Sequence, residues 1–363
     1  MKAIITAGGR GTRLRPFTHS NNKHLLPIAN KPMILYPLEQ IRDAGIKEIG
    51  IIVNETRAEI ENLLGDGSTF GVSLTYIFQE KPLGIGHCLK ISEEFLRGTD
   101  KFVMYLGDNV SALGIKVFVE DFAKSDKNAV MSLVKVDDLE KLKAWGVAEI
   151  EGDRVVRVEE KPQNPKPNHL GGAGIYFFDS NAFKAFSGKD AIVPSNRGEY
   201  EITSGVYRYL INHGYKVGYY NITGWWKDTG RMEDLIEANR LVLDKFDGFE
   251  VKGKIDANSK VVGDIKLGIG SIIENSNILG PVVIGENVII KNSKIGAYTA
   301  VGDNCQIVNS EIENSILMNG ASLTNLQNVS SSLIGSNAKI KKNGGAPNVS
   351  SIVVGDDSVI SLA

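Results

Sequence analysis

Three glycines and two arginines lie together in the segment Gly8-Gly-Arg-Gly-Thr-Arg13, directly after the apolar run 2–7. Such a run predicts a buried first strand of a parallel sheet. Glycines let backbone N–H groups approach an anion closely, and arginine adds charge and a fork of donors. A strand that leads into this turn is therefore a candidate phosphate-binding site.

The spacing of this turn excludes the two common nucleotide loops. A Rossmann fingerprint that starts at Gly9 would need a third glycine where Leu14 stands. A P-loop needs Lys and then Ser or Thr after its last glycine, whereas Thr12-Arg13 follows here.

Five further blocks accompany this turn. They are Asn22-Lys-His-Leu-Leu-Pro27, Asn30-Lys-Pro-Met33, Leu106-Gly-Asp-Asn109, Glu159-Glu-Lys-Pro162 and Trp225-Trp-Lys-Asp-Thr-Gly230. Together with Gly8-Gly-Arg-Gly-Thr-Arg-Leu14 they resemble the signature of the sugar-phosphate nucleotidylyltransferases. The resemblance covers residues 1–240, and the extended C-terminal part makes the chain most similar to the long thymidylyltransferases of this family.

The resemblance implies that a nucleoside triphosphate and a sugar 1-phosphate react to give a nucleotide sugar and pyrophosphate. It favours dTTP and glucose 1-phosphate as substrates. The alternatives are a UTP- or GTP-using enzyme and a non-catalytic regulatory subunit. A sugar phosphate oxygen would attack the α-phosphorus in line, so the protein must position two anions and neutralise their charge.

The resemblance also implies roles for individual residues. Arg13 would grip the pyrophosphate, Lys23 would draw the two phosphates together, and Asp108 and Asp228 would hold Mg²⁺, which prefers hard oxygen ligands. The nucleotide site would comprise Gly8, Gly9, Gly11, Thr12, Gln79, Gly84 and Asp108. The sugar-phosphate site would comprise Asn109, Gly146, Glu160, Lys161, Gly174 and Tyr176.

Some residues near these positions carry less specific signals. Gln79 matches the pyrimidine-reading amide of the family, and an amide supplies the donor and acceptor that an imide edge needs. His87 is expected on the surface of the next helix or behind the site, not as a catalytic base. The segment 197–201 resembles a sugar-site segment, although Glu201 could equally begin a helix.

Apolar strands alternate with helical patterns through the first two-thirds of the chain. We expect strands at 46–53, 73–79, 101–107 and 129–136, a hairpin at 147–150 and 154–158, and helices at 32–44, 55–64, 85–96, 115–124, 201–213 and 232–245. This alternation predicts an α/β fold with a mixed, mostly parallel Rossmann-like sheet. Ligands of such sheets lie outside the carboxyl ends of the strands, where the 8–13 turn and Asp108 stand.

The pattern changes near residue 250. Aliphatic residues then recur every five or six positions, at Ile284, Ile290, Ile295, Val301 and Ile307. A step near six is typical of a left-handed parallel β-helix built from hexapeptides. We therefore expect a nucleotidyltransferase domain at 1–240, a linker at 241–250 and a β-helix at 251–363, with a projecting loop at 341–347.

The β-helix is expected to be structural or to form a homo-oligomer through its exposed faces. Many β-helices are acyltransferases with a histidine base, but none of the five histidines of this chain lies beyond His213.

Composition excludes several other classes. The 41 basic and 43 acidic side chains nearly balance, which argues against a nucleic-acid-binding surface. Cys88 and Cys305 are expected to be buried, reduced thiols. No apolar run has the length of a membrane span and no signal peptide is apparent, so we expect a cytoplasmic location.

Overall fold

The computed structural model describes residues 1–342 and 351–362. Contacts divide the chain into two compact units, one made of Met1–Gly9 and Ile34–Asp228 and the other of Arg10–Met33 and Thr229–Ala363. This division differs from the expected sequential boundary near residue 240, because the signature segment 10–33 groups with the C-terminal unit. Most of the expected loop at 341–347 lies outside the described residues.

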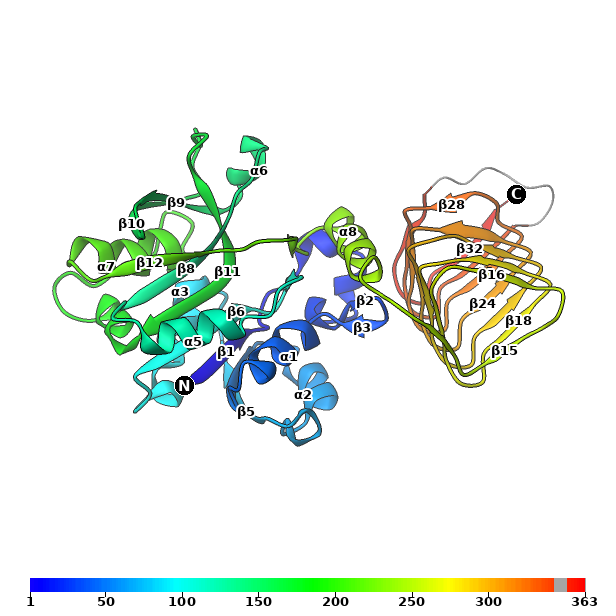
Figure 1. Ribbon diagram of the computed structural model, residues 1–363, viewed down its shortest axis with the longest axis horizontal. Helices are drawn as coiled ribbons and strands as arrows, with labels where there is room; N and C mark the ends of the chain where they lie inside the picture. The colour runs from blue at the N-terminus through cyan, green and yellow to red at the C-terminus, as the bar shows by residue number, and fades with distance from the viewer. Residues whose placement is uncertain (343–350, 363) are drawn as a thin grey trace. The chain divides into compact units, whose positions relative to one another are not determined.

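The first unit contains a nine-stranded sheet in the order β5-β4-β1-β6-β11-β8-β12-β10-β9 (Figure 1). Its strands are β1 (Lys2–Thr6), β4 (Glu48–Val53), β5 (Ser73–Phe78), β6 (Lys101–Leu106), β8 (Ala129–Val134), β9 (Gly146–Glu151), β10 (Arg154–Glu160), β11 (Leu170–Asp179) and β12 (Val217–Asn221). Strands β5, β4, β1 and β6 are parallel, whereas β11 runs antiparallel to both β6 and β8. The expected mixed α/β sheet is confirmed.

Helices connect these strands. They are α1 (Leu35–Asp43), α2 (Arg57–Leu64), α3 (Ile85–Ile91), α4 (Glu93–Leu96), α5 (Lys116–Lys124), α6 (Leu139–Leu142) and α7 (Arg208–Asn212), with 3₁₀ turns at Ser68–Phe70 and Ser180–Phe186 and a π turn at Ile202–Tyr207. A small sheet joins β7 (Asn109–Ser111) to β13 (Trp226–Asp228).

Two helices are shorter than the sequence predicted. The helix expected at 32–44 begins at Leu35, because Lys31–Pro32 forms strand β3 and pairs with Pro27–Ile28. The helix expected at 85–96 is broken at Ser92, whose hydroxyl donates to the carbonyl of Cys88 at 2.8 Å and competes with the helical pattern.

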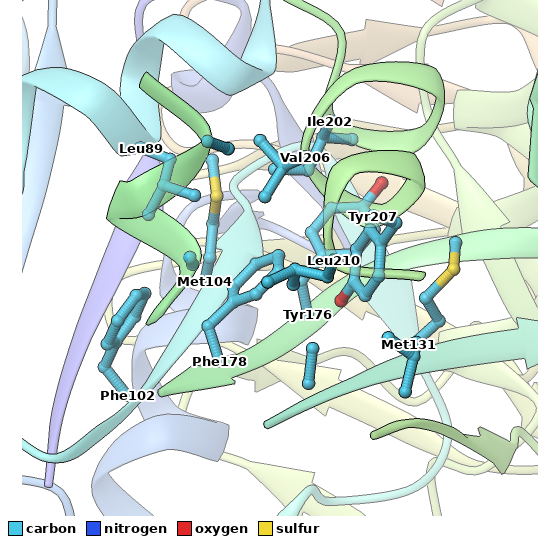
Figure 2. Close-up of a cluster of buried hydrophobic side chains, with 14 of the residues drawn as sticks. Leu89, Phe102, Met104, Met131, Tyr176, Phe178, Ile202, Val206, Tyr207 and Leu210 are labelled. Carbon is cyan, nitrogen blue, oxygen red and sulfur yellow. The ribbon is translucent and has the colours of Figure 1, made fainter. Parts of the chain in front are cut away.

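A cluster of aromatic and aliphatic side chains forms the core beside β11 (Figure 2). Tyr176 and Phe178 of β11 pack on Tyr207, with ring centroids 5.9 Å and 4.9 Å from it. The Tyr207 hydroxyl donates to the carbonyl of Val130 at 2.9 Å, so this buried polar group is satisfied. Tyr176 is therefore a core residue with 5% exposure.

The second unit begins with the signature segment. This segment has 3₁₀ turns at Thr12–Leu14, Phe17–His19 and Lys23–Leu25 and the hairpin β2 (Pro27–Ile28) and β3 (Lys31–Pro32); helix α8 (Met232–Leu243) follows later in the chain. The amide N–H of Ala29 donates to Asn239 of α8 at 2.8 Å, and the Asn30 side chain donates to the carbonyl of Val301 at 2.6 Å.

Residues 249–342 and 351–362 form a stack of short strands (Figure 1). One sheet holds β14 (Phe249–Val251), β17 (Ile265–Leu267), β20 (Val282–Ile284), β23 (Thr299–Val301), β26 (Ile316–Leu317), β29 (Leu333–Ile334) and β31 (Val353–Val354). The second holds β15 (Lys254–Ile255), β18 (Ile272–Glu274), β21 (Ile289–Lys291), β24 (Gln306–Val308), β27 (Ser322–Thr324), β30 (Lys339–Lys342) and β32 (Val359–Leu362). The third holds β16 (Lys260–Val262), β19 (Asn277–Leu279), β22 (Lys294–Ile295), β25 (Glu311–Glu313) and β28 (Val329–Ser330).

All of these pairings are parallel. Within each sheet, successive strands are separated in the sequence by one turn of the stack. Ile273 pairs with Ile290, and Ile290 pairs with Ile307, a step of 17 residues. These three side chains are completely buried, so the aliphatic repeat fills the interior as expected. Three parallel sheets connected in this way are consistent with a β-helix.

Asparagines form a ladder along one corner of the stack. Asn275 donates to Asn292 at 2.7 Å, Asn292 to Asn309 at 3.2 Å, and Asn309 to Asn325 at 3.1 Å. All four have left-handed backbone conformations with φ between 46° and 59°. Asparagine suits this corner because it tolerates that conformation and its amide both donates and accepts.

We expect Asn292→Ala to lower the free energy of unfolding by about 2 kcal/mol, from two lost side-chain bonds and a left-handed alanine. Asn292→Gly removes the same bonds without the conformational penalty, so it is expected to cost about half as much. Urea denaturation of both variants measures the difference. Equal losses would show that backbone conformation contributes nothing at this corner.

Candidate functional site

The carboxyl ends of β1 and β5 lie beside the end of β4. The Asn54 side chain, just past β4, donates to the carbonyl of Gly8 at 2.9 Å, and the amide N–H of Gln79 donates to Val53 at 2.7 Å. A β-carbon on Gly8 would lie 3.3 Å from Gln79 Oε1, so the first glycine of the signature and the candidate base-reading amide are neighbours.

Gly84 follows in the loop before α3. Its φ of 92° is unfavourable for other residues, and a β-carbon there would lie 2.8 Å from the carbonyl oxygen of Tyr200. Two backbone bonds join the same segments: Tyr200 N–H donates to Leu83 at 2.7 Å, and Gly86 N–H donates to Tyr200 at 2.8 Å. The absence of a side chain thus lets the 199–201 segment pack directly on this loop.

The two candidate metal ligands are brought together by strand pairing. In the antiparallel register of β7 and β13, Asp228 lies opposite Asn109, the residue after Asp108. Asp108 accepts a bond from the Asn109 side chain at 3.0 Å. Burial raises the pKa of Tyr176, and the charges of Glu160, Asp108 and Asp228 raise it further, so all three carboxylates act on one phenol.

Because Gly174 of β11 has no side chain, the Asn109 side chain can pack against it. Its φ is 66°, and a β-carbon there would lie 2.7 Å from Asn109 Oδ1. That oxygen is buried and accepts no hydrogen bond from the described part of the chain. Asn109 therefore presents an unpaired acceptor next to the carboxylate pair, which suits a ligand group that donates a hydrogen bond.

The candidate sugar-phosphate residues lie on β9 and β10. Glu160 pairs with Gly146 across the hairpin, and a β-carbon on Gly146 would lie 3.0 Å from Glu160 Oε2 and overlap Thr203 Oγ1. Lys161 follows with φ 47°, and its amide N–H donates to Trp145 at 2.9 Å. This bond fixes the backbone from which the lysine side chain extends.

Glu160 is enclosed by groups that affect its charge. Burial raises the pKa of Glu160 and the neighbouring Glu201 raises it further, while Lys161, Thr203 and Arg197 oppose these effects. The guanidinium of Arg197 lies 2.7 Å from Glu201 and 3.6 Å from Glu160. Glu160 is thus a half-buried acceptor whose negative charge is favoured by these basic neighbours.

The second unit holds the remaining candidates. A β-carbon on Gly11, whose φ is 60°, would lie 2.9 Å from Lys23 Cβ, and the Thr18 hydroxyl donates to the Gly11 carbonyl at 2.8 Å. Asn22 caps the turn of Lys23 by accepting from His24 N–H at 2.9 Å. Arg13 is exposed on the turn Thr12–Leu14, so each of the two cations lies on a short 3₁₀ turn.

The sequence did not assign some of these residues to the site. Arg197 and Glu201 lie in the segment 197–201, which is notable in the sequence only for its resemblance to a sugar-site segment. His87 was expected on a helix surface or behind the site, and Thr203 was not predicted. Arg197 and Thr203 reach Glu160 from a distant part of the chain, so their roles depend on the fold.

Two properties of the described residues bear on function. No helix among them combines the length and hydropathy needed to cross a membrane. They also contain no cluster of three or more His, Cys, Asp or Glu side chains that could hold a metal alone. A metal at Asp108 and Asp228 would therefore need substrate oxygens or water to complete its ligands.

Comparisons with known proteins identify the family of the chain. The family pattern described as Nucleotidyl transferase matches residues 2–245. A glucose-1-phosphate thymidylyltransferase from Streptomyces griseus is 41% identical over 99% of this chain and 98% of its own length. The enzyme of the same name from Streptomyces antibioticus is 42% identical over 100% of this chain and 99% of its own.

Solved structures give the same result. A Bacillus anthracis structure described as a glucose-1-phosphate thymidylyltransferase superposes with a TM-score of 0.61 at 38% identity, covering 68% of this chain and 97% of that one. Since the family pattern spans most of the chain and the Streptomyces relatives match its full length, this protein belongs to the nucleotidyl transferase family.

Proposed function

We propose that the protein catalyses the reaction of dTTP with glucose 1-phosphate to give dTDP-glucose and pyrophosphate. The observation that supports this proposal is the pairing of β7 with β13, in which Asp228 lies opposite Asn109, the residue that follows Asp108. Acidic ligands at that edge suit a metal-assisted transfer of a nucleotidyl group. The names of the full-length relatives support the choice of substrates.

The proposed metal is Mg²⁺, held by Asp108 and Asp228. The donor set fits, because both ligands are hard carboxylate oxygens and Mg²⁺ usually takes one or two carboxylates together with phosphates and water. When bound, the ion would offset the negative charge of the reacting phosphates.

The chain's own cations would carry the rest of the charge neutralisation. Lys23 would hold the sugar phosphate near the α-phosphate, and Arg13 would bind the β- and γ-phosphates with its two-pronged guanidinium. A bond forms between a sugar phosphate oxygen and the α-phosphorus as the bond to the bridging oxygen of pyrophosphate breaks. Gly8, Gly9, Gly11 and Thr12 would let backbone N–H groups face the triphosphate.

Substrate selection would divide between two sets of residues. Gln79 and Gly84 would bind the base. Glu160 would accept hydrogen bonds from sugar hydroxyls, and Lys161 would bind the sugar phosphate. Gly146, Gly174, Asn109 and the backbone of Tyr176 would shape the space between them.

We expect Gly146→Ala to raise KM for the sugar phosphate about 100-fold, because the new methyl group must displace Thr203 and Glu160. Gly114→Ala is the matched control, since a β-carbon there contacts nothing within 4 Å and Gly114 does not have a positive φ. Initial-rate kinetics measures both variants. An unchanged KM in Gly146→Ala would remove Glu160 from the sugar site.

The C-terminal stack is proposed to be a left-handed β-helix without transferase activity of its own. Its exposed sheet faces favour a homo-oligomer, and the protein is proposed to act in the cytoplasm.

A matrix of nucleoside triphosphates against sugar 1-phosphates, scored by pyrophosphate release with Mg²⁺, tests the proposal. Turnover is expected to be highest for dTTP with glucose 1-phosphate. Preferred use of GTP would contradict the pyrimidine assignment, and absence of turnover with every pair would favour a regulatory subunit.

A further inference from the structure

The buried amide of Gln79 has two ends in different surroundings. Its Nε2 lies 3.1 Å from His87 Nδ1 and 3.5 Å from the carbonyl oxygen of Gly84. Its Oε1 faces Gly8 and accepts no hydrogen bond from the described residues. Gln79 is only 5% exposed, so the direction of this amide determines what a ligand meets there.

The neighbours of the amide determine its direction. A carbonyl oxygen can only accept, so the Gly84 side of the amide must be the NH₂ end. His87 Nδ1 must then accept, which requires a neutral ring with its proton on Nε2.

The surroundings of His87 favour that neutral ring. The imidazole stacks on the Tyr200 ring, with the two centroids 6.1 Å apart. The Lys90 ammonium lies over the same Tyr200 ring, 5.3 Å from its centroid. Burial lowers the pKa of His87 and the Lys90 charge lowers it further. The groups facing the imidazole are thus Gln79, Lys90 and Tyr200, and none of them is an acid that would hold a proton on it.

We propose that His87 is a positioning residue for base selection, because its Nδ1 holds the Gln79 amide with Oε1 toward the ligand. This proposal rests on the proposed function, in which the base lies at Gln79. An acceptor there matches the N3–H of thymine or uracil and repels cytosine, whose N3 is itself an acceptor. His87 thereby excludes cytidine nucleotides without touching them.

Protonation of His87 reverses the arrangement. Nδ1 then carries a proton and faces the NH₂ end of Gln79, so two donors oppose each other. Rotating the amide by half a turn relieves this conflict and directs NH₂ toward the base. It also turns Oε1 toward the Gly84 carbonyl, but at 3.5 Å that contact is weaker than the 3.1 Å contact with His87. The N3–H of thymine then faces the NH₂ group of Gln79, and two donors oppose each other. Cytosine N3, an acceptor, instead receives a hydrogen bond from this NH₂ group. The preference for dTTP over dCTP should fall as the pH falls.

The test measures binding of dTTP and dCTP by calorimetry, and kcat/KM for both, from about pH 5 to pH 8. The wild-type preference for dTTP is expected to drop about 10-fold or more below the ordinary titration range of imidazole, as one matched hydrogen bond is exchanged for a mismatched one. The ratio of the two nucleotides cancels the ionisation of their phosphates.

Two variants separate positioning from simple structural support. His87→Gln can offer an amide oxygen to Gln79 without titrating, so it should keep the dTTP preference and lose its pH dependence. His87→Leu offers no acceptor, so its preference should be about 10-fold lower at every pH. Circular dichroism and thermal melting verify that both variants are folded.

The outcomes distinguish this proposal from the proposed function. A wild-type preference that does not change with pH, or a His87→Leu protein that retains it, overturns the role of His87. Absence of thymidine nucleotide binding also overturns it. If wild type binds dTTP with the expected pH response but releases no pyrophosphate, the catalytic proposal fails and the role of His87 stands.

Discussion

Asp108→Asn is expected to lower kcat by about 1000-fold, since a metal ion supplies several kcal/mol of charge stabilisation in reactions of this class. The asparagine has the same size as the aspartate. It also keeps an oxygen that can accept the hydrogen bond that Asn109 donates to Asp108 at 3.0 Å in the wild type. It removes the negative charge that is proposed to hold the cation. The fold should therefore persist while metal affinity and turnover fall together.

Pyrophosphate release at several Mg²⁺ concentrations and calorimetric titration with Mn²⁺ measure these two effects. Asp126→Asn is the matched control, because Asp126 is an exposed aspartate paired with Lys216 on the surface. The control should retain full activity. If Asp108→Asn keeps more than about a tenth of wild-type kcat at low Mg²⁺, Asp108 is not a metal ligand.

Arg13→Ala is expected to lower kcat by about 100- to 1000-fold with little change in KM for the nucleotide, because its proposed contact strengthens as charge accumulates on the pyrophosphate. Arg13→Lys keeps the charge but loses the two-pronged donor geometry, so it should recover only part of this loss. Initial-rate kinetics with dTTP and glucose 1-phosphate measures both variants.

Arg57→Ala is the control for Arg13, since Arg57 is a half-exposed arginine paired with Glu61 on α2. It should leave kcat unchanged. A parallel Arg15→Ala variant tests whether the loop acts only through its total charge. Equal losses in Arg13→Ala and Arg15→Ala would contradict a specific role for Arg13.

The C-terminal unit has a role that its sequence did not reveal. The segment that carries Arg13 and Lys23 groups with this unit, and the turn of its hairpin bonds to Asn239 and Val301. Asn21 also donates to Asp356 in the last described coil. The stack of parallel strands therefore supports the segment that carries the candidate cations, in addition to filling its own core.

Local patterns predicted those parts of the fold that depend on neighbouring residues. Alternating strands and helices gave the mixed sheet, and the aliphatic repeat gave the interior ladder of Ile273, Ile290 and Ile307. Helix limits were less accurate where tertiary contacts compete with the local preference. Pro32, expected to begin a helix, instead pairs with Pro27.

By itself, the sequence determined which chemical groups are present and which strand ends carry them, because motif spacing and hydrophobic period are local properties. Only the tertiary structure decided that Asp228 lies opposite Asn109, that Arg197 and Thr203 reach Glu160, and that His87 contacts the Gln79 amide. These partners come from separate elements of the chain. Their meeting depends on strand register and loop packing, which no single segment encodes.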